Sequence, residues 1–343
     1  MKSRWLGVVA VAGLLAVGIV LVVWRGPDWN AVRDAFTAVS WPWVAAAIGL
    51  NLLSVVTRSV SWDTCIEQSM EPPHPGYPLV FSAFCVGLFA NAVLPGRVGE
   101  LARVAVLRRR LGRKGVTATL VGSVFAHRVF DVFPTITLVV WVLFAAEIPR
   151  WAYLTLGLAI GLGVVLFVVA VVLARRQHRE LDSLGPMRQV LARARQGLAI
   201  MRKPPAALKA ASFQYLGWFC QLLAVWSAMR AFQIDEPLAA AGLVLVLMNV
   251  ATIVPLWPGN VGLVQIAVAT PLVNYGIAYA HGIAFGIGLQ AIEASVGIGI
   301  GLVFLAREGL SFATLKQMDD RVEETVDAEE EQEPERARSR IAG

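Results

Sequence analysis

Residues 91–110 read NAVLPGRVGELARVAVLRRR. An apolar run is broken at Pro95-Gly96, and charged residues appear as soon as the chain restarts. Three of them follow at one-turn intervals, and three consecutive arginines close the stretch: Arg97, Glu100 and Arg103, then Arg108 to Arg110. The fold has to explain why charge follows a helix breaker in so apolar a chain.

The composition places the chain among helical membrane proteins. Of its 343 residues, 57% are hydrophobic and only 16% are charged, which leaves too little polar surface for a soluble domain. Crossing a hydrocarbon core of roughly 30 Å takes about 20 helical residues. The full spans expected on this basis are Leu6–Trp24, Trp43–Trp62, Val116–Ala146, Trp151–Ala174, Leu208–Phe232 and Ile283–Ala306. The first is longer than the core of a signal peptide and is expected to remain as an anchor.

The positive-inside rule decides the course of residues 79–107. If Pro95 lay in a loop between two ordinary spans, the seven basic residues of 97–114 would lie outside. A re-entrant hairpin over 79–107 keeps them inside, together with the nine basic residues of 175–209. Both termini are then cytoplasmic, and the basic residues left outside are Arg25, Arg33, Arg150 and Arg230.

A second break lies in residues 254–263, VPLWPGNVGL. Residues 95–99 and 258–262 share the pattern P-G-x-V-G, 163 positions apart (258 − 95). On the same topology a second hairpin over 238–277 enters from outside, so the hairpins face each other, as in inverted-repeat transporters with discontinuous helices. We therefore expect an all-α membrane fold of about six full spans and two re-entrant hairpins. The break residues are Pro95, Gly96, Gly99, Pro258, Gly259 and Gly262.

The first break indicates a polar cavity. An unpaired charge in hydrocarbon costs about 2.5–3.5 kcal/mol, and broken backbone needs protein or water as its partner. The helix that restarts after Gly96 favours an anion at its positive end, and Arg97 adds charge there. Glu100 and Arg103 lie on one face. Either Glu100 neutralises an arginine and holds the hairpin, or the arginines bind a lipid phosphate while Glu100 carries a proton or orients a headgroup.

The sequence AHRVFD supplies a second charged cluster. Arg128 can pair with Asp131 at i, i+3, and His127 can meet Asp131 at i, i+4. The cluster is either a self-neutralising salt bridge or an anion contact at Arg128 balanced by Asp131. It lacks the further ligands of a metal site, so no metal or cofactor is expected. Arg58 and Trp62, one turn apart at the inner end of a span, are explained by snorkelling and an aromatic belt.

The remaining segments are simpler. Glu293 is the costliest polar residue of the second half and is placed to pair with Arg128 or Arg97. Residues 1–310 form the membrane domain, and its basic linker 175–207 is either an amphipathic helix on the inner leaflet or a solvated linker. From Asp319 the tail 311–343 holds ten acidic residues and four arginines, so it is expected to be disordered.

Four motifs together resemble the flippase-like membrane domain of lysylphosphatidylglycerol synthases. They are R-x3-W at Arg58 and Trp62, N-x3-P-x-R-x-G-E-x2-R from Asn91 to Arg103, R-x2-D at Arg128 and Asp131, and P-G-x-V-G from Pro258 to Gly262. The resemblance covers most of residues 1–310, and the family includes stand-alone members and relatives linked to polyprenyl-lipid glycosylation and hopanoid metabolism. The chain departs from the synthases because no soluble catalytic domain follows, so aminoacyl-lipid synthesis by this chain alone is not expected. It also has Gln265 where relatives often place a glutamate.

The resemblance implies a lipid flippase-like protein of the cell inner membrane, acting on an anionic phospholipid or a polyprenyl-phosphate-linked lipid. The headgroup contacts expected are Arg97, Arg103, Arg128, Asn91 and Asn260, and the groups that balance charge or carry protons are Glu100, Asp131 and Glu293.

Two other functions stay open. A membrane transferase would use Glu100 or Asp131 as a base and the arginines on a donor phosphate, whereas a non-catalytic partner would assist a separate lipid synthase or glycosyltransferase. No P-loop, nucleotide fingerprint or G-x-S-x-G motif indicates a soluble enzyme. The net charge of +6 does not indicate nucleic-acid binding, because the basic residues lie between spans.

Overall fold

The computed structural model describes residues 27–94, 98–113, 116–148, 203–253 and 258–310, with the single positions Gly157, Gly161 and Ile200. All regular structure in these ranges is helical, which confirms the all-α prediction. The segments expected at Leu6–Trp24, at nearly all of Trp151–Ala174, at most of the linker 175–207, at the tail 311–343 and at Pro95-Gly96-Arg97 lie outside the described residues.

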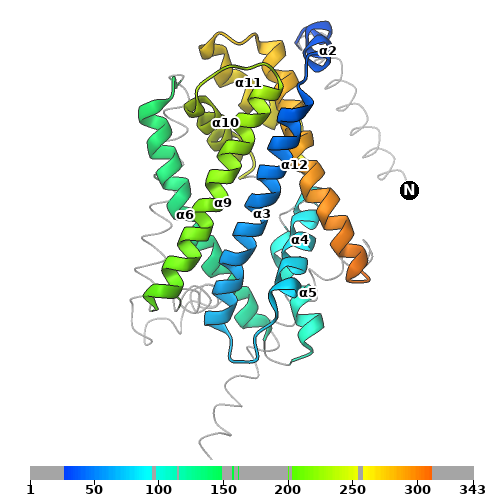
Figure 1. The fold of residues 1–343 in the computed structure, drawn as a ribbon, viewed down its shortest axis with the longest axis vertical. Coiled ribbons are helices and arrows are strands. Elements are labelled where there is room, and N and C mark those ends of the chain that lie inside the picture. The colour runs from blue at the N-terminus through cyan, green and yellow to red at the C-terminus, as the bar shows by residue number, and fades with distance from the viewer. Residues whose placement is uncertain are drawn as a thin grey trace, which may run out of the picture.

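Four long helices run the height of the molecule (Figure 1). They are α3 (Trp41–Ser69), α6 (Thr117–Ala145), α9 (Pro204–Ala231) and α12 (Tyr279–Arg307). Within the described residues α3, α6 and α12 are both long and apolar enough to cross a membrane. The fourth, α9, is long enough at about 42 Å but more polar, because glutamines interrupt its apolar sequence.

Between the long helices lie two pairs of short ones. The first pair is α4 (Tyr77–Val93) with α5 (Gly99–Leu111), and the second is α10 (Leu238–Ala251) with α11 (Leu263–Leu272), joined through the 3-10 turn η4 (Pro258–Asn260) and followed by η5 (Val273–Tyr275). Figure 1 shows α4 and α5 in the lower half and α10 and α11 in the upper half. A short helix, α2 (Trp29–Thr37), precedes α3 at the upper end.

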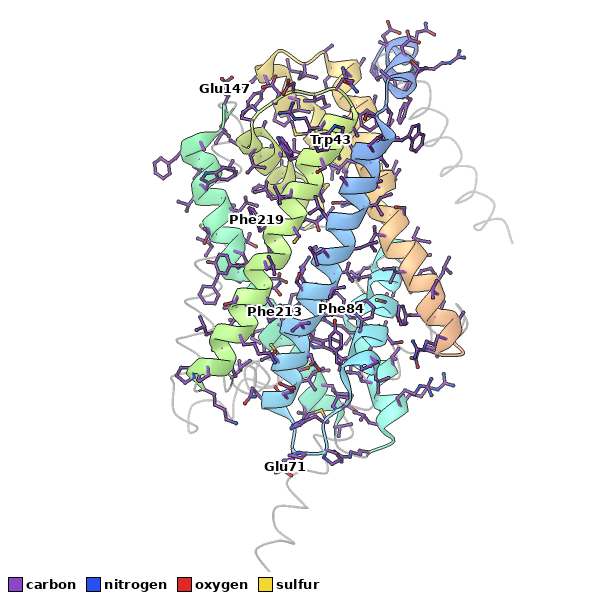
Figure 2. The ribbon with its side chains drawn as sticks, in the orientation of Figure 1. Trp43, Glu71, Phe84, Glu147, Phe213 and Phe219 are labelled. Atoms are coloured by element: carbon purple, nitrogen blue, oxygen red, sulfur yellow. The ribbon has the colours of Figure 1, made fainter. Side chains whose placement is uncertain are left out.

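The helix ends follow from local sequence. Prolines stand in the first turn of α3, α4 and α9. Proline is tolerated there because a backbone N–H at this position has no acceptor within the helix. Gly112 ends α5 in the left-handed conformation, with φ of 61°, which a glycine adopts without the penalty of a side chain. The exposed Glu71, after α3, and Glu147, after α6, mark opposite ends of the molecule in Figure 2.

Two of the long helices, α3 and α9, pack antiparallel. The N–H of Ser40 donates to the carbonyl of Ala231 at 2.8 Å at one end, and Ser61 Oγ donates to the carbonyl of Ala210 at 2.9 Å toward the other. Gly217 lies between, where a Cβ would come within 2.5 Å of Arg58 Cγ. Small residues therefore let the helices approach closely, as is usual where lipid supplies no hydrophobic drive between helices.

The buried hydrophobic residues form two clusters. One contains α4, α5, the lower part of α3 and the first half of α6, and the other contains α10, α11 and the second half of α6. Both clusters draw on α9 and α12. Each short pair thus has its own apolar support, while polar residues collect between the two clusters.

Candidate functional site

Asp131 of α6 joins three long helices. Its carboxylate accepts hydrogen bonds from Arg58 of α3 at 3.1 Å and from Arg128 at 3.1 Å. Trp218 Nε1 of α9 donates at 3.0 Å, and Gln214 Nε2 donates as well. The i, i+3 pair with Arg128 is as the sequence predicts. The donors from α3 and α9 make Asp131 the buried electrostatic centre of the lower half.

Glu100, in the first turn of α5, forms an ion pair with Arg128 of α6. It is not paired with Arg103, its neighbour one turn along α5. Arg128 therefore lies between two carboxylates, Glu100 and Asp131. This arrangement ties the first short pair to α6 and makes Arg128 a bridging residue.

Arg103 is buried, with 5% of its surface exposed. Its guanidinium carbon lies 4.5 Å from the ring centroid of Trp62 and 5.6 Å from that of Phe84, and Figure 2 shows Phe84 in the interior between α3 and α4. Nε and Nη2 of Arg103 have no hydrogen-bond partner. The interpretation of Trp62 as an aromatic-belt residue is wrong, because Trp62 is fully buried and donates to Ser123 Oγ at 3.2 Å.

Arg58 is not a snorkelling residue either. Its guanidinium points inward to Asp131, and the side chain lines a cavity. Sequence alone cannot separate a lipid-facing from a protein-facing arginine at the end of a span, because snorkelling and buried pairing both satisfy the same position.

His127 of α6 is buried, with 2% of its surface exposed. Its ring meets Phe84 edge to face at 6.0 Å between centroids. Neither Nδ1 nor Nε2 has a hydrogen-bond partner. Within the described part of the chain, no three His, Cys, Asp or Glu residues gather closely enough to hold a metal ion.

The first break is closed by Asn91 and two glycines. Asn91 Oδ1 accepts a hydrogen bond from the N–H of Gly99 at 2.9 Å, which satisfies a free amide at the start of α5. A Cβ on Gly99 would lie 2.0 Å from the carbonyl oxygen of Gly87, so α4 and α5 touch through backbone. Asn91 thus has a structural hydrogen bond at the first break.

The second break is closed by two glutamines. Gly259 and Gly262 have positive φ values of 68° and 94°, which only glycine adopts freely. Gln290 Nε2 of α12 donates to the carbonyl of Gly259. Gln265 Oε1 accepts from the N–H of Gly262 at 2.5 Å, while its Nε2 donates to Gln290 Oε1 at 2.5 Å. Gln265 therefore closes the second break through hydrogen bonds to Gly262 and Gln290.

Asn260 follows Gly259 and is buried, with 3% of its surface exposed. Its Nδ2 donates to the carbonyl of Ala251 at 2.9 Å. This bond satisfies a carbonyl at the end of α10.

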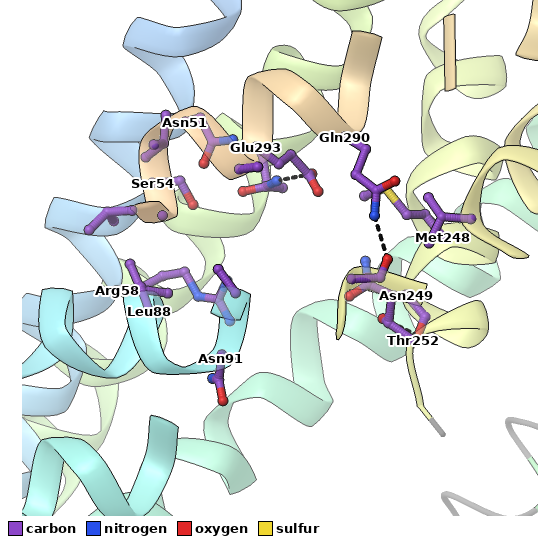
Figure 3. Close-up of a pocket in the computed structure, with 18 of the residues that line it drawn as sticks. Asn51, Ser54, Arg58, Leu88, Asn91, Met248, Asn249, Thr252, Gln290 and Glu293 are labelled. Carbon is purple, nitrogen blue, oxygen red and sulfur yellow. Dashed lines mark hydrogen bonds between the residues drawn. The ribbon is translucent and has the colours of Figure 1, made fainter. Parts of the chain in front are cut away.

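A cavity of about 350 Å³ lies between the two breaks (Figure 3). Its lining residues come from α3, α4, α9, α12, the end of α10, η4 and the start of α11. The lining residues with polar side chains, most of them carboxamide, hydroxyl or charged, are Asn51, Ser54, Arg58, Asn91, Trp218, Gln221, Asn249, Thr252, Gln290 and Glu293.

Glu293 is the acidic residue of this lining. Its Oε1 accepts a hydrogen bond from Gln221 Nε2 of α9 at 2.9 Å, and it makes no ion pair with Arg128, whose partners are Glu100 and Asp131. Of the two partners predicted for Glu293, Arg128 is therefore wrong, and Arg97 lies outside the described residues.

Several residues of the cavity and of the Asp131 cluster were not predicted from the sequence, and Arg58 was named without its inward position. Asn51, Ser54 and Arg58 follow one another at intervals of three and four residues along α3. Gln214, Trp218 and Gln221 follow at intervals of four and three along α9, where Trp218 and Gln221 line the cavity and Gln214 donates to Asp131. Polar residues at this spacing share one helix face. That periodicity inside otherwise apolar segments is the signal that could have found them.

One family model, described as Lysylphosphatidylglycerol synthase TM region, matches residues 5–301. The match covers both short pairs, all four long helices up to Gly301 and the whole cavity lining. No curated protein and no solved structure matches the chain.

Proposed function

Because the chain belongs to the lysylphosphatidylglycerol synthase TM region family of membrane proteins associated with lipid modification, we propose that it is a flippase-like lipid transporter. The cargo is an anionic phospholipid or a polyprenyl-phosphate-linked lipid. The observation that carries this proposal is the cavity of about 350 Å³ between the two helix breaks, whose lining includes charged, carboxamide and hydroxyl side chains. A chamber with such side chains inside a helical membrane domain can hold a headgroup while the lipid chains remain outside in the bilayer.

The proposed architecture is an inverted repeat with two re-entrant pairs. In its support, the order long, short, short, long occurs twice, as α3 to α6 and as α9 to α12. The long helices α3 and α9 begin 163 positions apart (204 − 41), the same offset as the two P-G-x-V-G motifs. Short helices of α4–α5 and α10–α11 lie in opposite halves of the molecule (Figure 1). Transporters with this design bind their substrate near the midplane, between the repeats.

Charge supports an orientation with the lower end in the cytoplasm. The basic residues described at the lower helix ends are Arg108, Arg109, Arg110, Arg113, Lys203, Lys209 and Arg307. At the upper ends the described basic residues are Arg33 and Arg230. Cytoplasmic loops carry the excess of Lys and Arg in multi-pass proteins, so the α4–α5 pair opens toward the cytoplasm and the α10–α11 pair toward the outside.

In the proposed mechanism the headgroup enters the cavity and arginines attract its phosphate. Arg103 has unused donors for this role, and Arg97 occupies the P-G-x-V-G position that Asn260 holds in the second half. Arg128 forms ion pairs with two carboxylates. It therefore adds positive charge near the headgroup but does not itself bind the phosphate. Glu293 faces the cavity and is the proposed proton carrier.

The test is lipid movement by the full chain in proteoliposomes that contain fluorescent phospholipid or short polyprenyl phosphate, read by quenching of the outer leaflet. Ala294→Phe places a large ring in the cavity, because Ala294 lines it, and is expected to reduce transport at least tenfold. Ser295→Phe is the matched control, since Ser295 is exposed one residue along the same helix. Equal transport by both variants would rule out the cavity as the route.

The transferase alternative finds less support in the geometry. Glu100 and Asp131, the two residues proposed as its base, are both bound to arginine. A carboxylate that is held in an ion pair with arginine is poorly placed to take a proton from a substrate. A non-catalytic partnership with a separate lipid synthase or glycosyltransferase is compatible with the same cavity and stays a proposal beside transport.

A further inference from the structure

A second, smaller cavity of about 60 Å³ adjoins the large one. It lies where α4, α5 and α6 meet. Four residues line both cavities and so mark their common boundary: Arg58, Phe84, Leu88 and Asn91. The small cavity is lined further by Gly87, Gly99, Glu100, Arg103, His127 and Arg128, and we name it the Arg103–His127 pocket.

The charges around this pocket do not cancel. Three guanidinium groups, those of Arg58, Arg103 and Arg128, face two carboxylates, those of Glu100 and Asp131. Both carboxylates are bound to Arg58 or Arg128. Among the described residues no ion pair includes Arg103, so the cluster carries one positive charge too many.

The excess positive charge lies on Arg103, which has no anionic partner among the described residues. The residue is 5% exposed, and Nε and Nη2 are buried without a hydrogen-bond partner. Stacking on Trp62 offsets part of the cost of burial, but it leaves these N–H groups unused. A buried cation without an anion is strongly unfavourable, which indicates that an anionic ligand completes the site.

His127 adds a second unused donor at the same place. Neither of its ring nitrogens has a partner, although the residue is 2% exposed. A neutral imidazole carries one N–H and one acceptor, so it can donate one hydrogen bond to an oxyanion. The pocket also lies at the N-terminal end of α5, where Gly99 lines it, and the positive end of a helix favours an anion.

We propose that the Arg103–His127 pocket binds one phosphate group. Arg103 supplies the charge and a forked pair of donors, and His127 supplies one further N–H. If the phosphate belongs to a transported lipid, the rest of the headgroup extends past Asn91 into the large cavity. This assignment rests on the proposed function and deepens it, because it names the chemical class of the cargo.

The pocket selects lipids that carry a single phosphate over pyrophosphate-linked lipids. Its volume is about 60 Å³, against about 350 Å³ for the large cavity, so we expect it to hold one phosphate and not a second. That group would have to lie in the large cavity, where the arginine among the described lining residues, Arg58, is already paired with Asp131. The same cavity holds the carboxyl group of Glu293.

The test is ligand binding by the full chain in dodecyl maltoside, a detergent without phosphate. The probes are dihexanoyl phosphatidylglycerol and inorganic phosphate, with binding read by phosphorus NMR line broadening and calorimetry. Arg103→Gln is expected to weaken binding of the lipid probe at least tenfold, because a charge-assisted hydrogen bond is lost. Arg109→Gln is the matched control on the same helix, exposed and outside the pocket, and should bind as wild type does.

A second variant and a second pair of probes test the site and its specificity independently. His127→Phe preserves a buried ring, so it should fold even where Arg103→Gln does not, and it should also weaken binding several-fold. Farnesyl phosphate should bind at least tenfold more tightly than farnesyl pyrophosphate. Binding by Arg103→Gln and His127→Phe within twofold of wild type would overturn the site, and equal binding of the two farnesyl probes would overturn the single-phosphate specificity.

A competition experiment distinguishes the phosphate of a lipid headgroup from free inorganic phosphate as the ligand. Displacement of inorganic phosphate by dihexanoyl phosphatidylglycerol supports a lipid site, whereas Arg103-dependent binding of inorganic phosphate that the lipid does not displace overturns the lipid assignment. Binding is measured here without transport. Loss of transport in proteoliposomes with binding intact therefore contradicts the proposed function alone, and transport with no Arg103-dependent binding contradicts the pocket alone.

Discussion

Asp131→Ala is expected to destabilise the folded protein by about 3–5 kcal/mol, the usual cost of removing one partner from a buried charge pair. The substitution removes the shared acceptor of Arg58, Arg128, Gln214 and Trp218, which come from three helices. Arg58 then has no ion pair within the described residues. The measurement is thermal unfolding of the purified protein in detergent, followed by tryptophan fluorescence.

The control for this prediction is Glu293→Gln. Glu293 also lies within a long helix, but its one recorded hydrogen bond comes from the neutral Gln221, so no cation is left unpaired. The melting temperature should fall by many degrees for Asp131→Ala and by little for Glu293→Gln. If the two variants melt alike, Asp131 does not hold α3, α6 and α9 together.

Gly99→Ala should disrupt the first short pair, although it adds only one methyl group. The new Cβ would meet the carbonyl oxygen of Gly87 at 2.0 Å and the side-chain amide of Asn91 at 2.6 Å. The closest atom belongs to the backbone, so α4 and α5 have to move apart. Overpacking of this kind costs about 1–3 kcal/mol or more, and it also opens the hydrogen bond from Gly99 to Asn91.

The matched control is Gly299→Ala, in α12. A Cβ at Gly299 meets no atom within 4 Å, so the helix gains a better helix former without a clash. We expect Gly99→Ala to lower both the melting temperature and the yield of monodisperse protein, and Gly299→Ala to leave both near wild type. Equal behaviour of the two variants would show that α4 and α5 do not pack through Gly87 and Gly99.

Hydropathy and helix breakers predicted most of the described fold. The span expected at Val116–Ala146 is α6, Thr117–Ala145, because long apolar runs and flanking polar residues mark helix ends directly. The breaks after Leu94 and around Pro258 also separate helices as expected. These features depend on local sequence, which is why they can be found without a structure.

The pairing of charges was harder to predict. Spacing placed Glu100 beside Arg103, yet Glu100 bonds to Arg128, because contacts between helices decide among partners that spacing leaves equivalent. Trp62 looked like an interfacial residue and is fully buried. In a membrane both the lipid-facing and the protein-facing sides of a helix are apolar, so hydrophobic periodicity does not tell which side is buried.

The proposed re-entrant course of α4 and α5 is the feature on which the facing breaks and the proposed transport depend. It predicts that the loop before α4 and the loop after α5 lie at the same membrane face. Single cysteines at Glu71 and Arg113 test this, with Gln233→Cys after α9 as the opposite-face control. Background labelling should be low, because the native Cys65, Cys85 and Cys220 are buried.

The measurement is labelling by an impermeant maleimide in intact cells and in inverted membrane vesicles. We predict that Glu71→Cys and Arg113→Cys both react in inverted vesicles and not in intact cells, while Gln233→Cys reacts in intact cells. Labelling of Glu71→Cys and Arg113→Cys from opposite faces would mean that α4 and α5 cross the membrane, and it would contradict the proposed arrangement.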